Sequence, residues 1–281
     1  MHRLVTGSSG CGKSRLVASR ATKRSAFSGR LVWQSSSRLR FFRSLLAARV
    51  RTIDAAPAMS FYADQILPRL LDFACGRKDI SRVRARVAQG LRGEVLEIGF
   101  GSGLNLPHMP AAVTALHAVD PSATGKRLAR SRLAASRIPI AWSGLDGQNL
   151  TLPDASVDCG LSTFTLCTVP DLDRTLREMR RVLRPGGIFH FLEHGRSPDA
   201  GVVRFQDMLT PLNRRLVGGC ELNRPIAESL RAAGFCIDSL ENYYLRGPKF
   251  SAYMYEGRAR ACAHGPEEEC GGTAQGGSGL T

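Results

Sequence analysis

A glycine-rich turn directly after a short apolar run is the feature that most constrains the fold of this 281-residue chain. The run Glu94–Ile98 has the composition of a buried strand, and Gly99, Gly101 and Gly103 follow it in a G-x-G-x-G pattern. Glycine lacks the Cβ atom that would hold a ligand away from the backbone, and we expect a helix after the turn to offer its free N–H groups. The segment therefore predicts a strand, a tight turn and a helix whose junction binds a small molecule.

Strand-like and helix-like runs alternate after this turn. The clearest helix spans Asp171–Leu183, where apolar residues recur on one face and Asp171 can cap the first turn. Arg184–Gly187 (RPGG) then ends the helix and turns the chain into the next strand. Further strand candidates are Val113–Asp120, Ile138–Ser143, Val157–Ser162 and Ile188–Glu193. This alternation predicts a parallel sheet with helices on both faces.

The C-terminal part departs from simple alternation. A helix at about Arg224–Ala233 is stopped by Gly234 and precedes two strands, Phe235–Tyr243 and Phe250–Glu256. The short link between these strands suits an antiparallel pair better than another crossover. The predicted fold class is α/β, with a doubly wound, mostly parallel, Rossmann-like sheet of seven strands that ends in an antiparallel hairpin.

Carboxylates follow the first three strands, at the edge where open α/β sheets bind ligands. Glu97 stands two residues before Gly99, which disfavours a pyrophosphate and suits a ligand with an amino group and a sulfonium. Asp120 ends the second strand, where a carboxylate can accept hydrogen bonds from ribose hydroxyls. Asp146 and Gly147 follow the third strand, where a carboxylate can accept from an adenine amino group and a glycine lets the backbone approach the ring.

Residues 94–193 resemble the class I S-adenosylmethionine-dependent methyltransferase domain of the ubiquinone/menaquinone-biosynthesis type. The matching segments are VLEIGFGSG, AVDPS, DGQNLTLPDASVD and LREMRRVLRPGG. The wider stretch 59–258, with STFTLCTV, FHFLEHGRS and GGCELNRPIAESLRAAGF, is similar to the methyltransferase-like family. Its animal members resemble thiol methyltransferases, and some bacterial relatives methylate phospholipid headgroups. The resemblance implies S-adenosylmethionine as cofactor and a small, lipophilic acceptor: a thiol, a quinone or phenol ring, or a phospholipid amine.

The resemblance also carries cofactor contacts over to this chain residue by residue. The expected cofactor-binding residues are Glu97, Gly99 and Gly101 at the methionine end, Gly103 in the turn, Asp120 at the ribose, and Asp146 and Gly147 at the adenine. Two positions depart from the family pattern. Gly147-Gln148 stands where family members commonly have Ala-Glu, and Phe100, in place of a small residue or Cys, would alter the pocket wall. Neither departure removes a group that the cofactor needs.

The methyl acceptor is expected beside the fourth and fifth strands, because methyl transfer requires a nucleophile aligned with the sulfonium methyl group. The candidates in that region are Thr163, Cys167, Glu193 and His194. His194 is the candidate general base if the acceptor needs one, and the alternative is a histidine that caps a strand end. Tyr62 and the apolar helix of residues 66–73 are expected to form a lid over an apolar substrate or, alternatively, to pack as ordinary core.

A competing motif lies near the N-terminus. Residues 7–14 (GSSGCGKS) match the phosphate-binding pattern G-x-x-x-x-G-K-[ST], in which Lys13 and Ser14 would bind the terminal phosphate and magnesium. This P-loop phosphotransferase is the alternative function. Residues 15–58 contain a single acid, Asp54, and no second strand, which leaves such a fold without its other parts. We therefore expect a methyltransferase domain over residues 59–258, with Met59 as functional start, preceded by a disordered extension over residues 1–58.

The positive charge is concentrated in that extension, which holds 12 of the 39 Lys and Arg residues and one of the 24 acidic residues. The rest of the chain is close to charge balance, so we expect no nucleic-acid partner. We expect a cytoplasmic protein whose basic N-terminal arm makes a weak, peripheral contact with anionic membrane. No run of 18 apolar residues is present, and the Gly-rich residues 259–281 predict a disordered tail.

The eight cysteines show no C-x-x-C pair and no regular spacing, so no metal site is expected. Cys262, His264 and Cys270 in the tail are a weak alternative to that expectation. Cys159 and Cys236 stand in strand-like runs and are expected to be buried thiols in a reducing compartment. Nothing in the sequence determines the oligomeric state.

Overall fold

The computed structural model describes residues 61–262. The phosphate-loop match at residues 7–14, the expected extension over residues 1–58 and most of the expected tail lie outside the described residues.

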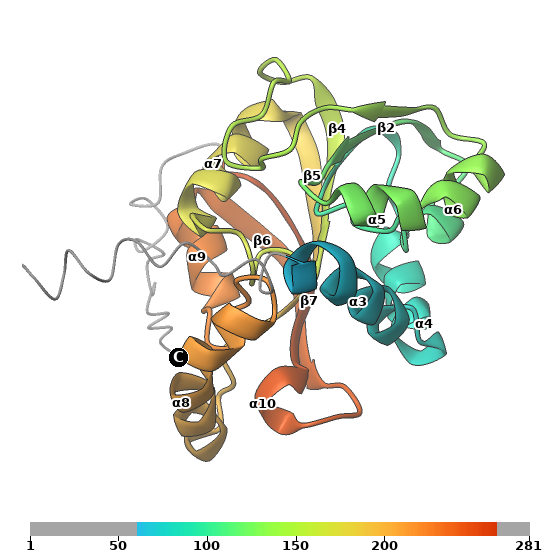
Figure 1. Ribbon diagram of the computed structural model, residues 1–281. Helices are drawn as coiled ribbons and strands as arrows, with labels where there is room; N and C mark the ends of the chain where they lie inside the picture. Colours follow the sequence, from blue (N-terminus) through green and yellow to red (C-terminus); the bar gives the residue numbers. More distant parts are fainter. Residues whose placement is uncertain (1–60, 263–281) are drawn as a thin grey trace, which may run out of the picture. The chain divides into compact units, whose positions relative to one another are not determined.

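Seven strands form one sheet in the order β3-β2-β1-β4-β5-β7-β6 (Figure 1). The strands are β1 Gly93–Ile98, β2 Val113–Val119, β3 Ile140–Trp142, β4 Val157–Thr163, β5 Leu183–His194, β6 Phe235–Tyr244 and β7 Tyr253–Ala261. Strands β1 to β5 pair in parallel, and β7 is antiparallel to both of its neighbours, β5 and β6. The predicted seven-stranded, mostly parallel sheet with a final antiparallel pair is confirmed.

Helices cover both faces of this sheet (Figure 1). The helical segments are η1 Tyr62–Ile66, α3 Leu67–Cys75, α4 Lys78–Ala88, η2 Leu106–His108, α5 Ala123–Leu128, α6 Arg130–Ala135, α7 Leu172–Val182, α8 Ala200–Leu216, α9 Ile226–Ala232 and α10 Lys249–Ala252. Asp171 caps α7 as predicted, because its side chain accepts a hydrogen bond from the backbone N–H of Arg174 at 2.9 Å.

Alternation along the strands divides the core into two clusters. Leu96 of β1 packs in a cluster with Met179 of α7, whereas its neighbour Val95 packs in a cluster with Val83 of α4. Successive side chains of a strand point to opposite faces of its sheet, so both faces of β1 are buried. Burial on both faces is what a parallel sheet with crossover helices requires.

The α-helix expected after the glycine-rich turn does not form. The chain instead makes only the short 3₁₀ turn η2, Leu106–His108. Pro107 and Pro110 lack the backbone N–H groups that a longer α-helix would need as donors. This part of the site is therefore built by the turn itself and by the Asn105 side chain, not by a helix end.

Strand boundaries near the C-terminus also differ from the expected ones. β5 already begins at Leu183, which pairs with Val157, so the RPGG segment belongs to the strand. The last strand begins at Tyr253 because residues 249–252 form α10, and it continues to Ala261. The expected domain boundary at residue 258 thus falls inside β7.

Cys159 is a buried free thiol, as predicted, but the expectation for Cys236 is wrong. Cys236 forms a disulfide with Cys262, and their Cα atoms lie 5.2 Å apart. The antiparallel register of β6 and β7 brings Cys236 opposite Arg260, close to the end of β7, where Cys262 follows. A pairing created by strand register leaves no trace in cysteine spacing.

Helix α8, which the sequence did not predict, turns a polar side chain inward. Gln206 is fully buried, and its Nε2 donates to the carbonyl oxygens of Gly195 and Leu222 at 2.9 and 2.8 Å. The exposed apolar residues of this helix are Phe205, Met208, Leu212 and Leu216. None of the helices in residues 61–262 is long and apolar enough to cross a membrane.

Candidate functional site

The glycine-rich turn after β1 lies against the segment that follows β4. Gly99 has φ +78°, and a Cβ atom at this position would lie 1.8 Å from Thr165 Oγ1. A Cβ atom on Gly125 of α5 would lie 2.9 Å from the carbonyl oxygen of Gly101. A Cβ atom on Gly101, by contrast, would meet nothing closer than the carbonyl oxygen of Gly99 at 3.9 Å. Packing therefore requires glycine at 99 and 125, while position 101 leaves open space beside the backbone.

The side chain of Phe100 points into the core instead of lining this space. It is buried and packs edge-on against Trp142, with ring centroids 5.2 Å apart. A Cβ atom on Gly103 would lie 3.1 Å from the Phe100 ring, so this glycine makes room for the aromatic side chain. The departure from the family pattern at position 100 is thus accommodated inside the core.

Asp120 joins the end of β2 to the glycine-rich turn. Its Oδ2 accepts from the Gly101 N–H and its Oδ1 from the Ser122 N–H, both at 2.7 Å. Burial raises the pKa of Asp120, and the two N–H donors oppose that shift. Each carboxylate oxygen has further lone pairs, so the group can still accept from a ligand.

Asp146 and Gly147 occupy the end of β3, one strand further from β1. Asp146 is exposed, and its Oδ1 accepts from the backbone N–H and the Nε2 of Gln148, both at 2.8 Å. A Cβ atom on Gly147 would lie 2.9 Å from Ile98 Cγ2, so the backbone there approaches β1 closely. The predicted residues at the ends of β1, β2 and β3 thus follow one another along a single edge of the sheet.

A buried polar network lies beneath the glycine-rich turn. Asn105 donates from Nδ2 to Glu97 Oε1 at 2.7 Å and to Thr163 Oγ1 at 2.9 Å. Arg84 of α4 donates from Nη1 to Asn105 Oδ1 at 2.9 Å and to Thr163 Oγ1 at 2.6 Å. Thr163, expected beside the acceptor, is therefore part of the network around Glu97. Arg84 and Asn105 are site residues that the sequence analysis missed.

Two atoms of this network have no hydrogen-bond partner among residues 61–262: Glu97 Oε2 and Arg84 Nε. Burial raises the pKa of Glu97 to about 8, although the amide of Asn105 and the charge of Arg84 oppose the shift. Burial also lowers the pKa of Arg84. An unpaired buried polar atom costs free energy, so the network fits a ligand that presents a cation to Glu97 and an anion to Arg84.

Glu193, at the end of β5, holds the segment after β4 in place. Its Oε1 accepts from Ser162 Oγ at 2.7 Å, and its Oε2 accepts from the Thr165 N–H at 2.8 Å. The side chain is fully buried, and burial raises its pKa. Because both oxygens are engaged within the chain, Glu193 orients the segment that carries Thr165.

His194 and Cys167 lie together with Cys220, which the sequence analysis did not single out. His194 Nε2 is 2.9 Å from Cys220 Sγ, and all three side chains are buried. The pKa of Cys220 falls to about 5, chiefly through hydrogen bonding from Cys167 and also through His194, while the same contact raises the pKa of Cys167 well above its usual value. Burial lowers the pKa of His194, but the Cys220 thiolate more than offsets this and raises it. We define these three residues as the Cys167–His194–Cys220 cluster.

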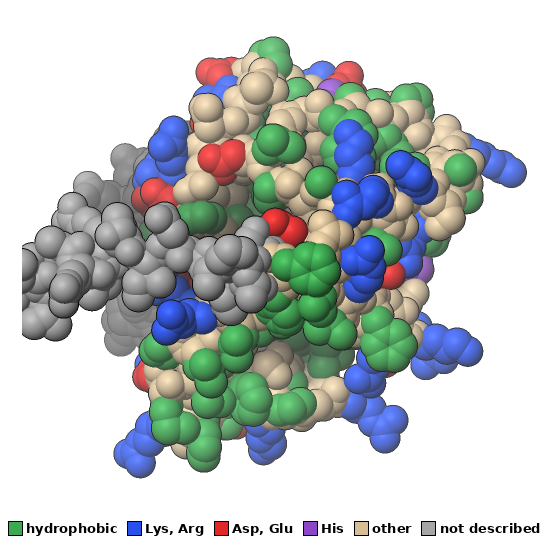
Figure 2. Space-filling model, in the orientation of Figure 1, with side chains coloured by type: hydrophobic (Ala, Val, Ile, Leu, Met, Phe, Trp, Pro, Cys, Tyr) green, Lys and Arg blue, Asp and Glu red, His purple; other side chains and the backbone are tan. Residues whose placement is uncertain are grey.

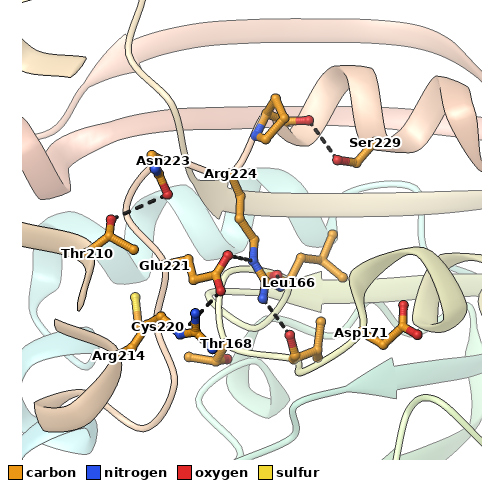
Figure 3. A network of polar contacts seen from close by, with 12 residues as sticks. Leu166, Thr168, Asp171, Thr210, Arg214, Cys220, Glu221, Asn223, Arg224 and Ser229 are labelled. Carbon is orange, nitrogen blue, oxygen red and sulfur yellow. Dashed lines mark hydrogen bonds and ion pairs between the residues drawn. The ribbon is translucent and has the colours of Figure 1, made fainter. Parts of the chain in front are cut away.

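Arg224 fixes the backbone around the cluster (Figure 3). Its guanidinium donates to the carbonyl oxygens of Leu166 and Val169, the latter at 2.7 Å, and its Nε donates to Glu221 Oε2 at 3.0 Å. The Glu221 N–H in turn donates to the Cys167 carbonyl oxygen at 2.8 Å. The segment after β4 and the segment after α8 are thereby held as one unit.

Tyr62 lies apart from these groups, at the contact between η1 and α8. Its hydroxyl donates to the carbonyl oxygen of Leu216 at 3.0 Å. Figure 2 shows hydrophobic side chains gathered over α3 and α8 with Lys and Arg side chains around them. The exposed apolar residues of η1 and α3 and the residue before them are Phe61, Ile66, Leu70, Leu71 and Phe73. Most of this helical segment is thus exposed, and among its apolar side chains Leu67 alone is buried in the core.

Helix α3 is fastened to the glycine-rich turn. Ser102 Oγ donates to Asp72 Oδ1 at 2.6 Å, and Arg132 Nη1 donates to the same oxygen at 2.9 Å. An open hollow on this helix is lined by Phe61, Gln65, Ile66, Arg69 and Leu70. Helix α3 therefore carries both the contact with the turn, through Asp72, and part of the apolar surface.

Comparison with known proteins identifies the class. A family model described as a methyltransferase domain matches residues 96–191. The chain is 35% identical to the human thiol S-methyltransferase TMT1A over 149 residues, which are 50% of this chain and 59% of that protein. It is 30% identical to the phosphatidylethanolamine N-methyltransferase of Cereibacter sphaeroides over 158 residues, 50% of this chain and 74% of that protein.

A shorter stretch of 68 residues is 47% identical to the ubiquinone/menaquinone biosynthesis C-methyltransferase UbiE of Caulobacter sp. strain K31, covering 24% of this chain and 27% of that protein. Among solved structures, a SAM-dependent methyltransferase of Leishmania major has a TM-score of 0.54 at 12% identity, covering 72% of this chain and 82% of that one. This last likeness concerns the fold alone. The chain spans about three-fifths of the length of human TMT1A.

The chain belongs to the class I S-adenosylmethionine-dependent methyltransferases. S-adenosylmethionine is the cofactor of this class, and the comparisons give no support to a P-loop phosphotransferase. The residues present fit this cofactor. Its amino-acid end carries an ammonium, which can donate to Glu97 Oε2, and a carboxylate, which can accept from Arg84 Nε, the two atoms without a partner among residues 61–262.

Proposed function

We propose that this chain transfers the methyl group of S-adenosylmethionine to a small, lipophilic acceptor and that the acceptor atom is a thiol sulfur. The observation that supports the cofactor part is a pair of buried atoms beside the glycine-rich turn, Glu97 Oε2 and Arg84 Nε, which have no hydrogen-bond partner in the described part of the chain. The similarity to thiol S-methyltransferases, at 32 to 35% identity in human, rat and mouse, favours the thiol.

Each predicted cofactor residue has a proposed task except Gly103, which makes room for the Phe100 ring, and Arg84 is added to the set. Glu97 accepts from the α-amino group, Arg84 pairs with the carboxylate, and the backbone at Gly99 and Gly101 lies alongside the methionine part. Asp120 accepts from the ribose hydroxyls. Asp146 accepts from the adenine amino group, and the backbone at Gly147 lies against the ring. The support is the position of these groups at successive carboxyl ends of β1, β2 and β3.

When bound, the cofactor supplies a methyl group on a positively charged sulfur, which a nucleophile can attack directly. The chain then needs chiefly to align that nucleophile and to exclude water. A thiol is already partly ionised near neutral pH because its ordinary pKa is about 8.5. No dedicated base is needed for such an acceptor, and we do not assign that task to His194, because its Nε2 faces Cys220.

The lipophilic character of the acceptor is supported by the apolar surface of α3 and α8. Helix α3, which carries part of this surface, contacts the glycine-rich turn through Asp72 and Ser102. We propose that the helical segment with Tyr62 covers the acceptor as a lid. A second candidate acceptor is a phospholipid amine, favoured by the phosphatidylethanolamine N-methyltransferase relative and by the Lys and Arg side chains around the apolar surface.

Release of S-adenosylhomocysteine, measured with a panel of acceptors, tests the proposal. The panel contains small apolar thiols, a short-chain hydroquinone, and vesicles of phosphatidylethanolamine. We expect turnover with apolar thiols to exceed that with the other two classes. Turnover with the vesicles and with no other class would identify the acceptor as a phospholipid amine and not a thiol. Binding of S-adenosylhomocysteine without turnover of any class would refute the transferase function.

A further inference from the structure

The Cys167–His194–Cys220 cluster is assembled from three separate parts of the chain. Cys167 follows β4, His194 ends β5, and Cys220 follows α8. One donor atom from each residue lies within 4.8 Å of the other two. Within residues 61–262 this is the only group of three or more Cys, His, Asp or Glu side chains with such convergent donor atoms.

Backbone contacts fix each member of the cluster. The Cys167 carbonyl oxygen accepts from the Glu221 N–H at 2.8 Å, and the Cys220 carbonyl oxygen accepts from Asn213 Nδ2 at 2.8 Å. His194 pairs with Met254 across the antiparallel contact of β5 and β7. Paired strands and short hydrogen bonds thus hold the backbone of the three residues in positions from which their donor atoms converge.

The donor set has the chemistry of a zinc site. Two thiolates and one imidazole suit Zn²⁺, and three protein ligands leave a fourth position for water or another external donor. Zinc bonds of about 2.3 Å to sulfur and 2.0 Å to nitrogen place tetrahedral S and N donors about 3.5 Å apart. The present 2.9 Å between His194 Nε2 and Cys220 Sγ would have to lengthen by about 0.6 Å.

Charge balance favours the same ion. A divalent cation with two thiolates and a neutral imidazole has no net charge, which suits side chains that are 2, 9 and 5% exposed for Cys167, His194 and Cys220. Binding would release two protons, one from Cys167 and one shared by His194 and Cys220. His194 Nδ1, which has no hydrogen-bond partner among residues 61–262, keeps the remaining ring proton and leaves Nε2 free as ligand.

We propose that Cys167, His194 and Cys220 bind one zinc-type divalent cation with an open fourth coordination position. The site lies at the carboxyl ends of β4 and β5, beside the segment that Arg224 and Glu193 hold in place. The bound metal ties that segment to the segment after α8. The inference does not rest on the proposed acceptor, because metal binding is measured with no methyl acceptor present.

Cobalt and zinc titrations of the full chain, after treatment with a chelator, test the site. We expect one equivalent of Co²⁺ to give the intense visible bands of tetrahedral thiolate coordination and one equivalent of Zn²⁺ to abolish them. Cys167→Ala, Cys220→Ala and His194→Gln should each lower the affinity at least tenfold. Cys159→Ala, which removes a buried free thiol from β4 outside the cluster, is the matched control and should titrate like the unaltered chain.

A second measurement needs no variant and so does not depend on their folding. Zn²⁺ should slow the alkylation of Cys167 and Cys220 by iodoacetamide in the unaltered chain, while Cys75, a half-buried thiol outside the cluster, reacts at an unchanged rate. Absent cobalt–thiolate bands would overturn the proposal. So would bands that persist in Cys220→Ala, or equal alkylation of Cys167 and Cys220 with and without Zn²⁺.

Discussion

The two halves of the ligand-binding edge of the sheet are built in different ways. The proposed cofactor half, at the ends of β1 and β2, comes mostly from a continuous segment that includes the glycine-rich turn, and buried atoms of Glu97 and Arg84 have no hydrogen-bond partner there among residues 61–262. The other half, at the ends of β4 and β5, combines segments from three parts of the chain. Glu193 and Arg224 form hydrogen bonds with backbone groups of the segment after β4. The first half therefore keeps a buried carboxylate and a buried guanidinium for the proposed ligand, whereas in the second half the carboxylate and the guanidinium bind the chain's own backbone.

This comparison can be tested by separating stability from cofactor affinity in each half. The largest expected effect is that of Gly99→Ala, because an added Cβ would overlap Thr165 and the residue would keep a positive φ. We expect the free energy of unfolding to fall by about 4 kcal/mol. Urea denaturation measures it, with Gly201→Ala as control. No atom lies within 4 Å of a Cβ at 201, a helical position, so this change should be neutral or stabilising.

Arg224→Met should lower stability and leave cofactor affinity unchanged, whereas a substitution in the proposed cofactor half should lower cofactor affinity. It leaves the buried carbonyl oxygens of Leu166 and Val169 without their donor and should lower the free energy of unfolding by about 3 kcal/mol. S-adenosylhomocysteine affinity of the folded fraction should change little. Denaturation and calorimetry separate the two quantities, and Arg215→Met, at an exposed position of α8, is the control. A large affinity loss in Arg224→Met with unchanged stability would contradict the division into two halves.

Asp120→Ala probes the cofactor half directly. In the proposed binding mode, removal of the carboxylate deprives two ribose hydroxyls of an acceptor, and it should weaken S-adenosylhomocysteine binding by about 2 kcal/mol. Calorimetry on this variant and on Asp146→Ala would compare the ribose and adenine contacts. Unchanged affinity in Asp120→Ala would show that the ribose lies elsewhere.

The smallest expected effect, at most about 1.4 kcal/mol per pH unit, is a pH dependence of cofactor affinity. The carboxyl of Glu97 has a pKa of about 8 in the free protein, and the ammonium of the ligand favours its ionised form. Binding near pH 7 should therefore release a proton, and the affinity for S-adenosylhomocysteine should rise between pH 6 and 8 by at most tenfold per pH unit. Calorimetry in buffers of different ionisation enthalpy counts the protons. Glu97→Gln should remove the dependence, and an unaltered slope in that variant would assign the proton to another group.

The sequence predicted the positions of the candidate residues at the ends of β1 and β2 better than those at the ends of β4 and β5, for a physical reason. A turn between a strand and the next element is local, so its glycines and carboxylates stand in order along the chain. Arg84 was missed among several arginines of α4, although helical periodicity places it on the same face as Ile80, Val83 and Val87. The sequence pattern thus indicated that Arg84 faces inward, but a charged residue on an apolar helix face was not recognised as a site residue.

The second half could not be predicted in the same way. Cys167 and His194 were noted one by one, but their proximity to Cys220 depends on how the segment after α8 returns to the sheet. Helix α8 itself was not recognised in the sequence. Its apolar residues face outward and Gln206 faces inward, which is the reverse of the usual amphipathic pattern. The Cys236–Cys262 disulfide similarly depends on strand register and not on spacing.

The position of β7 in the sheet has a consequence for folding during synthesis. It is the last strand of the described sheet to leave the ribosome, yet it lies between β5 and β6. Until residues 253–261 have been synthesised, β5 keeps one open edge and β6 has no partner in the sheet. Closure of the sheet is therefore a late, non-local step, and a nascent or truncated chain that stops before Tyr253 exposes two strand edges on which other copies can assemble.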